Sequence, residues 1–163
     1  MKAVIALGCN IEPRRENLCS ALQSLIHVPH IKILQVSALY ETEPVGFAEE
    51  NPAPFYNACV LVDTALTPEG LLGACLGIES AMGRRRNGTV SSRPIDLDLI
   101  ACEGYACQTA LLTLPHPRVL ERAFVLLPLS DLFPEKNALG LDFSEALHQI
   151  SKKGIQKLRD FSF

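Results

Sequence analysis

Residues 93–100, with the sequence RPIDLDLI, constrain the fold most, because aliphatic and acidic residues alternate strictly from Ile95 to Leu99. In a β-strand, successive side chains point to opposite faces of the sheet. We therefore predict a strand over 95–101 whose aliphatic side chains enter a core, while Asp96 and Asp98 stand together on the other face. Two like charges on one strand face repel each other, so this pair suits a cation held between the carboxylates.

Positive charge precedes the two aspartates, in Arg93 and in the run of three arginines at 84–86. Hard carboxylate oxygens next to guanidinium groups are what a magnesium-bound polyphosphate requires. The Asp-x-Asp pattern alone is weak, however. A half-solvated strand whose acidic side chains only face water remains the alternative at this point.

Length and composition limit the class of protein. The 163 residues fit one domain, 1–163, and 48% hydrophobic residues with 20% charged residues are typical of a globular chain. A net charge of −3 disfavours a general nucleic-acid binder, and no apolar run is long enough to span a membrane. The six cysteines form no Cys-x-x-Cys pair, and the N-terminus lacks an export signal. We expect a cytoplasmic monomer with reduced cysteines, no zinc site, and neither a nucleic-acid nor a membrane partner.

The periodicity of apolar residues predicts the order of elements. Strands are expected at 2–7, 31–40, 55–63 and 95–101, and helices at about 14–27 and from a Thr67 cap to Gly83. A polar loop covers 41–54 and a basic loop 84–92, while 106–113 is extended, 118–122 and 124–132 are helical, and 143–158 is weakly helical. The βαββαβ order predicts a ferredoxin-like α+β sandwich, an antiparallel sheet with helices on one face and a C-terminal α-rich extension. The other face should stay open for ligands.

Six motifs occur in the order and spacing of one known family. They are LGCN at 7–10, YxTEPVG at 40–46, FxNA at 55–58, GRxR at 83–86, RPIDLD at 93–98 and LPHPR at 114–118. The chain resembles 6-hydroxymethyl-7,8-dihydropterin pyrophosphokinase over nearly its whole length. None of the motifs is decisive alone, but their ordered combination is specific.

The resemblance implies transfer of pyrophosphate from ATP to the hydroxymethyl group of the dihydropterin, with release of AMP. It implies two Mg²⁺ ions held by Asp96 and Asp98, which would neutralise developing charge. Arginines suit phosphate oxygens because they stay charged and offer paired donors. The implied catalytic residues are Arg84, Arg86, Arg93, Asp96 and Asp98, and the implied ATP-binding residues are Glu79, Arg84, Arg93, Leu99, His116 and Arg122.

The resemblance also implies a pterin site. Phe55 and Phe124 match two rings that sandwich the heterocycle, and Asn57 offers a donor and an acceptor to its amide edge. Further pterin contacts are implied for Thr42, Pro44 and Val45. Without the resemblance, both phenylalanines would be interpreted as core residues.

The chain departs from the family pattern in the basic loop, where 87–92 reads NGTVSS and lacks the usual further basic residue, aromatic residue and Gly-Pro step. Two other functions are considered. A non-catalytic ligand-binding module would not need the acidic pair with Arg84 and Arg93. An RNA-binding sheet would need a basic surface and aromatic residues on its central strands, which this sequence does not offer.

Overall fold

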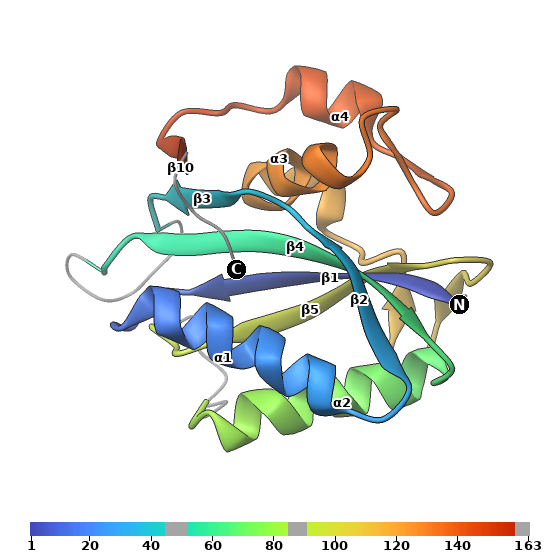
Figure 1. Ribbon diagram of the computed structural model, residues 1–163. Helices are drawn as coiled ribbons and strands as arrows, with labels where there is room; N and C mark the ends of the chain where they lie inside the picture. Colours follow the sequence, from blue (N-terminus) through green and yellow to red (C-terminus); the bar gives the residue numbers. More distant parts are fainter. Residues whose placement is uncertain (45–51, 85–90, 159–163) are drawn as a thin grey trace.

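The computed structural model describes residues 1–44, 52–84 and 91–158, and its centre is a six-stranded antiparallel sheet (Figure 1). The strands are β1 Lys2–Cys9, β2 Ile31–Val36, β3 Leu39–Thr42, β4 Phe55–Thr64, β5 Asp96–Cys102, β6 Cys107–Gln108, β7 Thr113–Leu114, β8 Asn137–Ala138, β9 Leu141–Asp142 and β10 Ile155–Leu158. The helices are α1 Arg14–His27, α2 Pro68–Ala81, the 3-10 turn η1 Val119–Glu121, α3 Ala123–Leu132 and α4 Ser144–Gln149.

The main sheet has the order β10-β3-β4-β1-β5, and β2 also pairs with β4. An α+β fold with an antiparallel sheet is therefore confirmed. The predicted strand at 31–40 is divided into β2 and β3, which pair with opposite ends of β4. The division lies at Ser37, whose hydroxyl accepts the hydrogen bond of the Cys59 amide at 2.9 Å in place of a backbone carbonyl.

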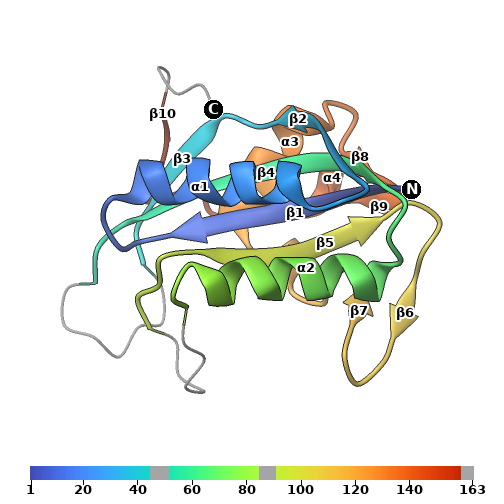
Figure 2. The same cartoon turned by 60° about the horizontal axis from the view of Figure 1, so that its bottom comes forward.

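Helices α1 and α2 lie side by side over one face of the sheet, as predicted (Figure 2). The start of α2 is fixed by the Thr67 hydroxyl, which accepts a hydrogen bond from the Gly70 amide at 3.1 Å. The helix is followed by Gly83, whose φ of +86° suits a residue without a Cβ. Between these helices and the sheet lies a core that includes Leu18, Leu71 and Leu97.

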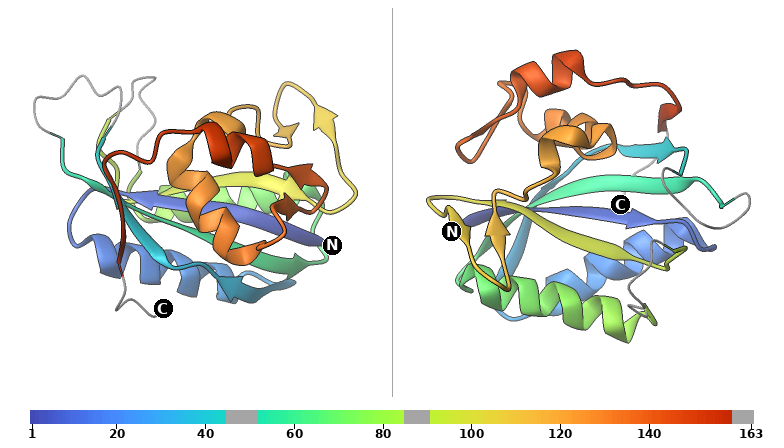
Figure 3. Two further views of the ribbon diagram at one scale, coloured as in Figure 1. Left: turned by 90° about the horizontal axis from the view of Figure 1, so that it is seen from above. Right: turned by 180° about the vertical axis from the view of Figure 1, so that it is seen from behind.

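The prediction that the opposite face stays open is wrong over part of the sheet, because α3 packs across it and α4 packs on α3 (Figure 3). A second buried cluster joins Val4, Cys59 and Ile100 of the strands to Leu126 and Leu129 of α3. The burial along β5 reflects this arrangement: it alternates at the beginning of the strand and is continuous from residue 99 onward. One half of β5 is therefore covered on both faces, and the other half faces a cavity.

The prediction of weak helical structure over 143–158 is also wrong in part. Helix α4 ends at Gln149, and residues 155–158 form β10, which pairs with β3. Gly154 turns the chain at a φ of +74°, and the edge of β3 supplies backbone partners that a surface helix would leave unused. Among the described residues, every helix is too short or too polar to traverse a lipid bilayer.

Candidate active site

A cavity of about 380 Å³ opens at the end of the sheet at which strand β1 ends and strands β4 and β5 begin. Strand register brings the site together, since Gly8 pairs with Asn57 on one side and with Asp96 on the other. A Cβ at Gly8 would lie 3.1 Å from Asn57 Oδ1 and 3.9 Å from both Phe55 Cδ1 and the Asp96 Cβ. Glycine therefore lets the aromatic, amide and acidic side chains approach one another.

Asp96 and Asp98 both line this cavity, as the alternation predicts for side chains on one face of the strand. The Asp96 carboxylate pairs with Arg84 through Oδ1, and with Arg93 through Oδ2 at 2.9 Å. Asp98 Oδ2 accepts a hydrogen bond from Arg122 Nη1 at 3.0 Å. Each carboxylate thus has at least one guanidinium partner, which offsets the repulsion between the two.

Glu79 has a different position from the other predicted site residues. Its side chain is 2% exposed, and its Oε1 accepts the Leu97 amide at 2.7 Å and also pairs with Arg84. Glu79 is absent from the lining of the cavity and instead holds Arg84 and the start of β5 together. A contact between Glu79 and nucleotide remains a prediction.

Asn10, the last residue of the LGCN motif at 7–10, was not predicted to belong to the site. Its Oδ1 accepts the Arg93 amide at 2.8 Å, and its Nδ2 donates to Ser92 Oγ at 2.9 Å and to the Ala53 carbonyl at 3.3 Å. It therefore joins the segment before Phe55 to the segment that carries Arg93. In the sequence, Asn10 is marked only as a polar residue that follows a buried strand. This pattern is too common to predict that its side chain joins two segments of the site.

The aromatic part of the cavity contains Phe55, Phe124, Asn57 and Thr42. Asn57 Nδ2 donates to Thr42 Oγ1 at 2.8 Å, which fixes the orientation of the amide. Each phenylalanine has an arginine near its ring: the Arg93 guanidinium carbon lies 5.3 Å from the centre of Phe55, and that of Arg122 lies 5.7 Å from the centre of Phe124. Aromatic and charged side chains therefore lie next to one another in the cavity.

A second cavity of about 330 Å³ lies between α2, β5 and the β6–β7 hairpin, and both cavities are lined by Asp98 and His116. Its walls are largely aliphatic and include Leu72, Leu76 and Leu99. His116 Nδ1 accepts the Arg118 amide at 3.1 Å. Burial lowers the pKa of His116, although the nearby Asp98 opposes this, so a neutral ring with its proton on Nε2 is favoured.

Comparison with known proteins identifies the family. Residues 4–134 match the family model described as 7,8-dihydro-6-hydroxymethylpterin-pyrophosphokinase (HPPK). The chain is 40% identical over 157 residues to 2-amino-4-hydroxy-6-hydroxymethyldihydropteridine pyrophosphokinase of Methylorubrum extorquens, covering 96% of this chain and 98% of that protein. It is 39% identical over 130 residues to the Bacillus subtilis protein of the same name, covering 80% and 77%. The chain belongs to the HPPK family.

A solved structure of an HPPK protein has a fold similar to that of this chain. The wild-type Plasmodium falciparum HPPK-DHPS with pteroate matches with a TM-score of 0.67 at 16% identity, over 91% of this chain. At this identity the likeness concerns the fold alone, and this chain spans 44% of that longer chain. The family resemblance inferred from the six motifs is confirmed.

Most of the residues predicted for an HPPK site come together. Those that line the first cavity are Thr42, Pro44, Phe55, Asn57, Arg84, Arg93, Asp96, Asp98, His116, Arg122 and Phe124. Leu99 lines the second cavity, beside Asp98 and His116. Val45 and Arg86 lie outside the described residues.

Proposed function

We propose that this chain transfers pyrophosphate from ATP to the hydroxymethyl group of 6-hydroxymethyl-7,8-dihydropterin and releases AMP. Pyrophosphokinase activity in folate biosynthesis is that of the HPPK family, to which the chain belongs. Beyond this family activity, we propose that ATP is the pyrophosphate donor, that Mg²⁺ takes part, and that single residues have the roles given below. The observation that carries it is that the two carboxylates of β5, four arginines and two phenylalanines line one cavity.

The aromatic part of the first cavity suits the pterin. Phe55 and Phe124 would hold the flat heterocycle by stacking, and Asn57 would bind its amide edge. Because one N–H of Asn57 is engaged by Thr42, its Oδ1 and second N–H are oriented for a ligand. The hydroxymethyl group would then point toward the carboxylates of β5.

The second cavity suits the base and ribose of ATP, because its aliphatic walls can cover a flat ring. The triphosphate would run past Asp98 and His116, the two residues that both cavities share, and reach Asp96. The Nε2–H of His116 would donate to a phosphate oxygen. Leu99 would contact the base from β5, and Arg122 would exchange Asp98 for phosphate.

Asp96 and Asp98 fit a Mg²⁺ site that is completed by the substrate. Within residues 1–44, 52–84 and 91–158, no group of three or more His, Cys, Asp or Glu side chains could hold a metal ion without it. Mg²⁺ is commonly bound by one or two carboxylates together with substrate phosphates, and Asp96 and Asp98 supply this donor set. Two bound ions would neutralise the polyphosphate and lower the pKa of the attacking hydroxyl.

The arginines supply the remaining charge. Arg84 and Arg93 bind Asp96, so ligand binding requires these guanidinium groups to exchange a carboxylate for a phosphate oxygen. Arg93 is already suited to this exchange, because its buried Nε–H has no hydrogen-bond acceptor in the described part of the chain. An incoming phosphate oxygen would satisfy it.

An AMP-release assay with ATP and the dihydropterin, with and without Mg²⁺, tests the proposal. We expect AMP and pterin pyrophosphate to form in equal amounts, only when both substrates and the metal are present. ATP without pterin is the control for simple hydrolysis. Absence of AMP in the complete mixture would favour the ligand-binding module over the enzyme.

We also propose that the sheet belongs to the ferredoxin-like class. The order β3-β4-β1-β5, with α1 and α2 on one face, supports this assignment. A single domain and a cytoplasmic monomer remain predictions.

A further inference from the structure

We infer that β10, which lies outside the 4–134 match to the family model, positions the pterin end of the active site through a contact between Gly154 and Glu43. The inference rests on the proposed function, because it names what this contact does for the heterocyclic substrate. Gly154 is a positioning residue here, since it acts through Glu43. It lies more than a hundred residues after Glu43 in the sequence.

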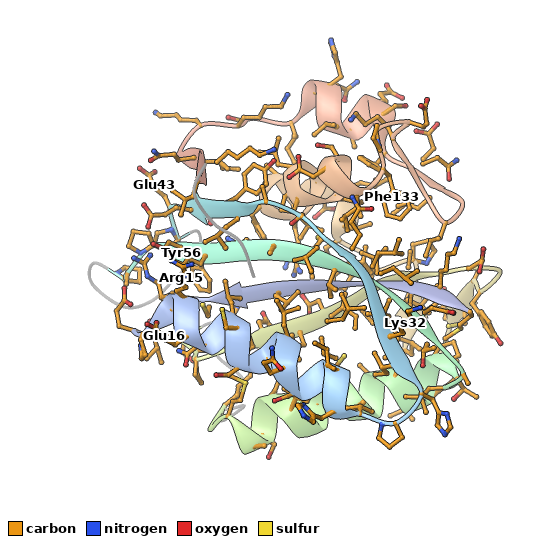
Figure 4. All side chains as sticks on the ribbon, in the orientation of Figure 1. Arg15, Glu16, Lys32, Glu43, Tyr56 and Phe133 are labelled. Atoms are coloured by element: carbon orange, nitrogen blue, oxygen red, sulfur yellow. The ribbon has the colours of Figure 1, made fainter. Side chains whose placement is uncertain are left out.

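The ladder between β10 and β3 runs up to the cavity. Ile155 pairs with Thr42, and the next backbone hydrogen bond beyond the strand joins the Glu43 amide to the Gly154 carbonyl at 3.0 Å. Thr42, Glu43 and Pro44 all line the first cavity. The position of Glu43 at the end of β3 can be followed in Figure 4. The backbone that carries three lining residues is thus fixed by the strand beside it.

The absence of a side chain at Gly154 also leaves room for the Glu43 side chain. A Cβ on Gly154 would lie 2.8 Å from Glu43 Oε2, closer than real Cβ atoms come to a neighbour, and 3.0 Å from its Cδ. The carboxylate therefore rests directly against the glycine backbone. Any side chain at 154 would push Glu43 away from its present place at the cavity.

One carboxylate holds β10 in register. Lys157 Nζ lies 2.7 Å from Asp131 Oδ1, and Asp131 Oδ2 accepts hydrogen bonds from the Tyr40 hydroxyl at 3.0 Å and the Ala38 amide at 3.2 Å. Asp131 belongs to α3, the helix whose first turn carries Phe124. The strands β10 and β3 are therefore attached to the same helix that supplies one pterin ring.

The effect should reach the pterin rather than ATP. Thr42 is the residue whose hydroxyl accepts from Asn57, so a shift at the end of β3 would be passed to the amide that we assign to the pterin. The second cavity, which we assign to the ATP base, contains no residue of β3, β4 or β10 among its lining. A change at Gly154 should therefore separate the two substrates.

The test compares Gly154→Ala with Gly104→Ala. Gly104 has nearly the same φ, +75° against +74°, but a Cβ there would meet nothing within 4 Å. Both variants thus place a Cβ on a residue of positive φ, and only one displaces Glu43. Pterin affinity is measured by titration calorimetry, and KM for each substrate by AMP release.

We expect Gly154→Ala to weaken pterin binding about tenfold, which corresponds to about 1.4 kcal/mol, and to leave the KM for ATP within about twofold. Gly104→Ala should leave both values within about twofold. In a Glu43→Ala background the displaced carboxylate is gone, so adding Gly154→Ala should have little further effect on pterin affinity. Equal pterin affinities for Gly154→Ala and Gly104→Ala would overturn the inference.

Lys157→Met gives a second route if Gly154→Ala does not fold, because it removes the ion pair to Asp131 and keeps the apolar stem. It should also raise the KM for pterin more than that for ATP, and an unchanged ratio would contradict the inference. The same measurements distinguish a failure of the proposed function from a failure of the role of β10. Wild-type protein without AMP release contradicts the proposed function, whereas active wild type with normal Gly154→Ala contradicts only the role of β10.

Discussion

Glu79 should be the site residue whose loss costs the most stability. Its carboxylate is almost fully buried and holds both Arg84 and the Leu97 amide. Removing one partner of a buried ion pair costs about 3–5 kcal/mol. Because Arg84 retains Asp96, we expect Glu79→Gln to lower the free energy of unfolding by less than this, by about 2–3 kcal/mol.

Glu79→Ala should cost more than Glu79→Gln, because it also leaves the Leu97 amide without its acceptor. An unsatisfied buried donor adds about 1–3 kcal/mol. The assay is urea unfolding followed by circular dichroism. With an m-value of about 2 kcal/mol per M, Glu79→Gln should lower the midpoint by about 1–1.5 M, and Glu79→Ala by more.

Glu121→Gln is the control, since Glu121 and its partner Arg118 are exposed surface residues whose pairing contributes little. Its midpoint should match that of the wild type. Activity supplies an independent check, because a loosened Arg84 should lower kcat in the folded Glu79→Gln variant. A Glu79→Gln midpoint equal to that of Glu121→Gln would refute the assignment of Glu79 as the support of Arg84 and β5.

Three further predictions concern single side chains. Asp98→Asn should abolish AMP release while the melting temperature changes little, because the side chain is a third exposed; retained turnover would contradict the metal assignment. Phe124→Ala should weaken pterin binding more than ATP binding, and equal losses would indicate a packing role. Burial raises the pKa of Cys102 to about 11, so this thiol stays protonated and unreactive at pH 8 and reacts only as the pH approaches that value. A disulfide-exchange reagent at pH 8 should therefore modify Cys19 and Cys107 first, which are only half-buried, and rapid loss of a third thiol would argue against this burial.

The sequence predicts the acidic face of β5 well, because the requirement that Asp96 and Asp98 share a face follows from strand geometry alone. It predicts the aromatic part poorly. Phe55 is 7% exposed and begins a strand rich in β-formers, so nothing in its local pattern separates it from a core residue. Phe124 likewise begins an apolar helix, and only the family resemblance assigned these two rings to a pterin.

Two elements differ from their predicted structure for one physical reason: both are determined by tertiary pairing, which local periodicity does not contain. The face expected to be open is covered because α3 is apolar enough to be buried on the sheet, with Val125, Leu126 and Leu129 all buried. The segment at 155–158 becomes a strand because β3 offers it an edge. Neither α3 nor this segment has a local signal that names its partner.

The change of burial pattern within β5 sets the depth of the active-site cavity. Up to Asp98 one face of the strand lines the first cavity, and from Ile100 onward α3 occupies that face. The first turn of α3 is therefore the back wall of the first cavity, and Val125 contributes to it. A redesigned enzyme for bulkier heterocycles would have to trim α3 at this wall, whereas changes along β5 would disturb the core before they gained any room.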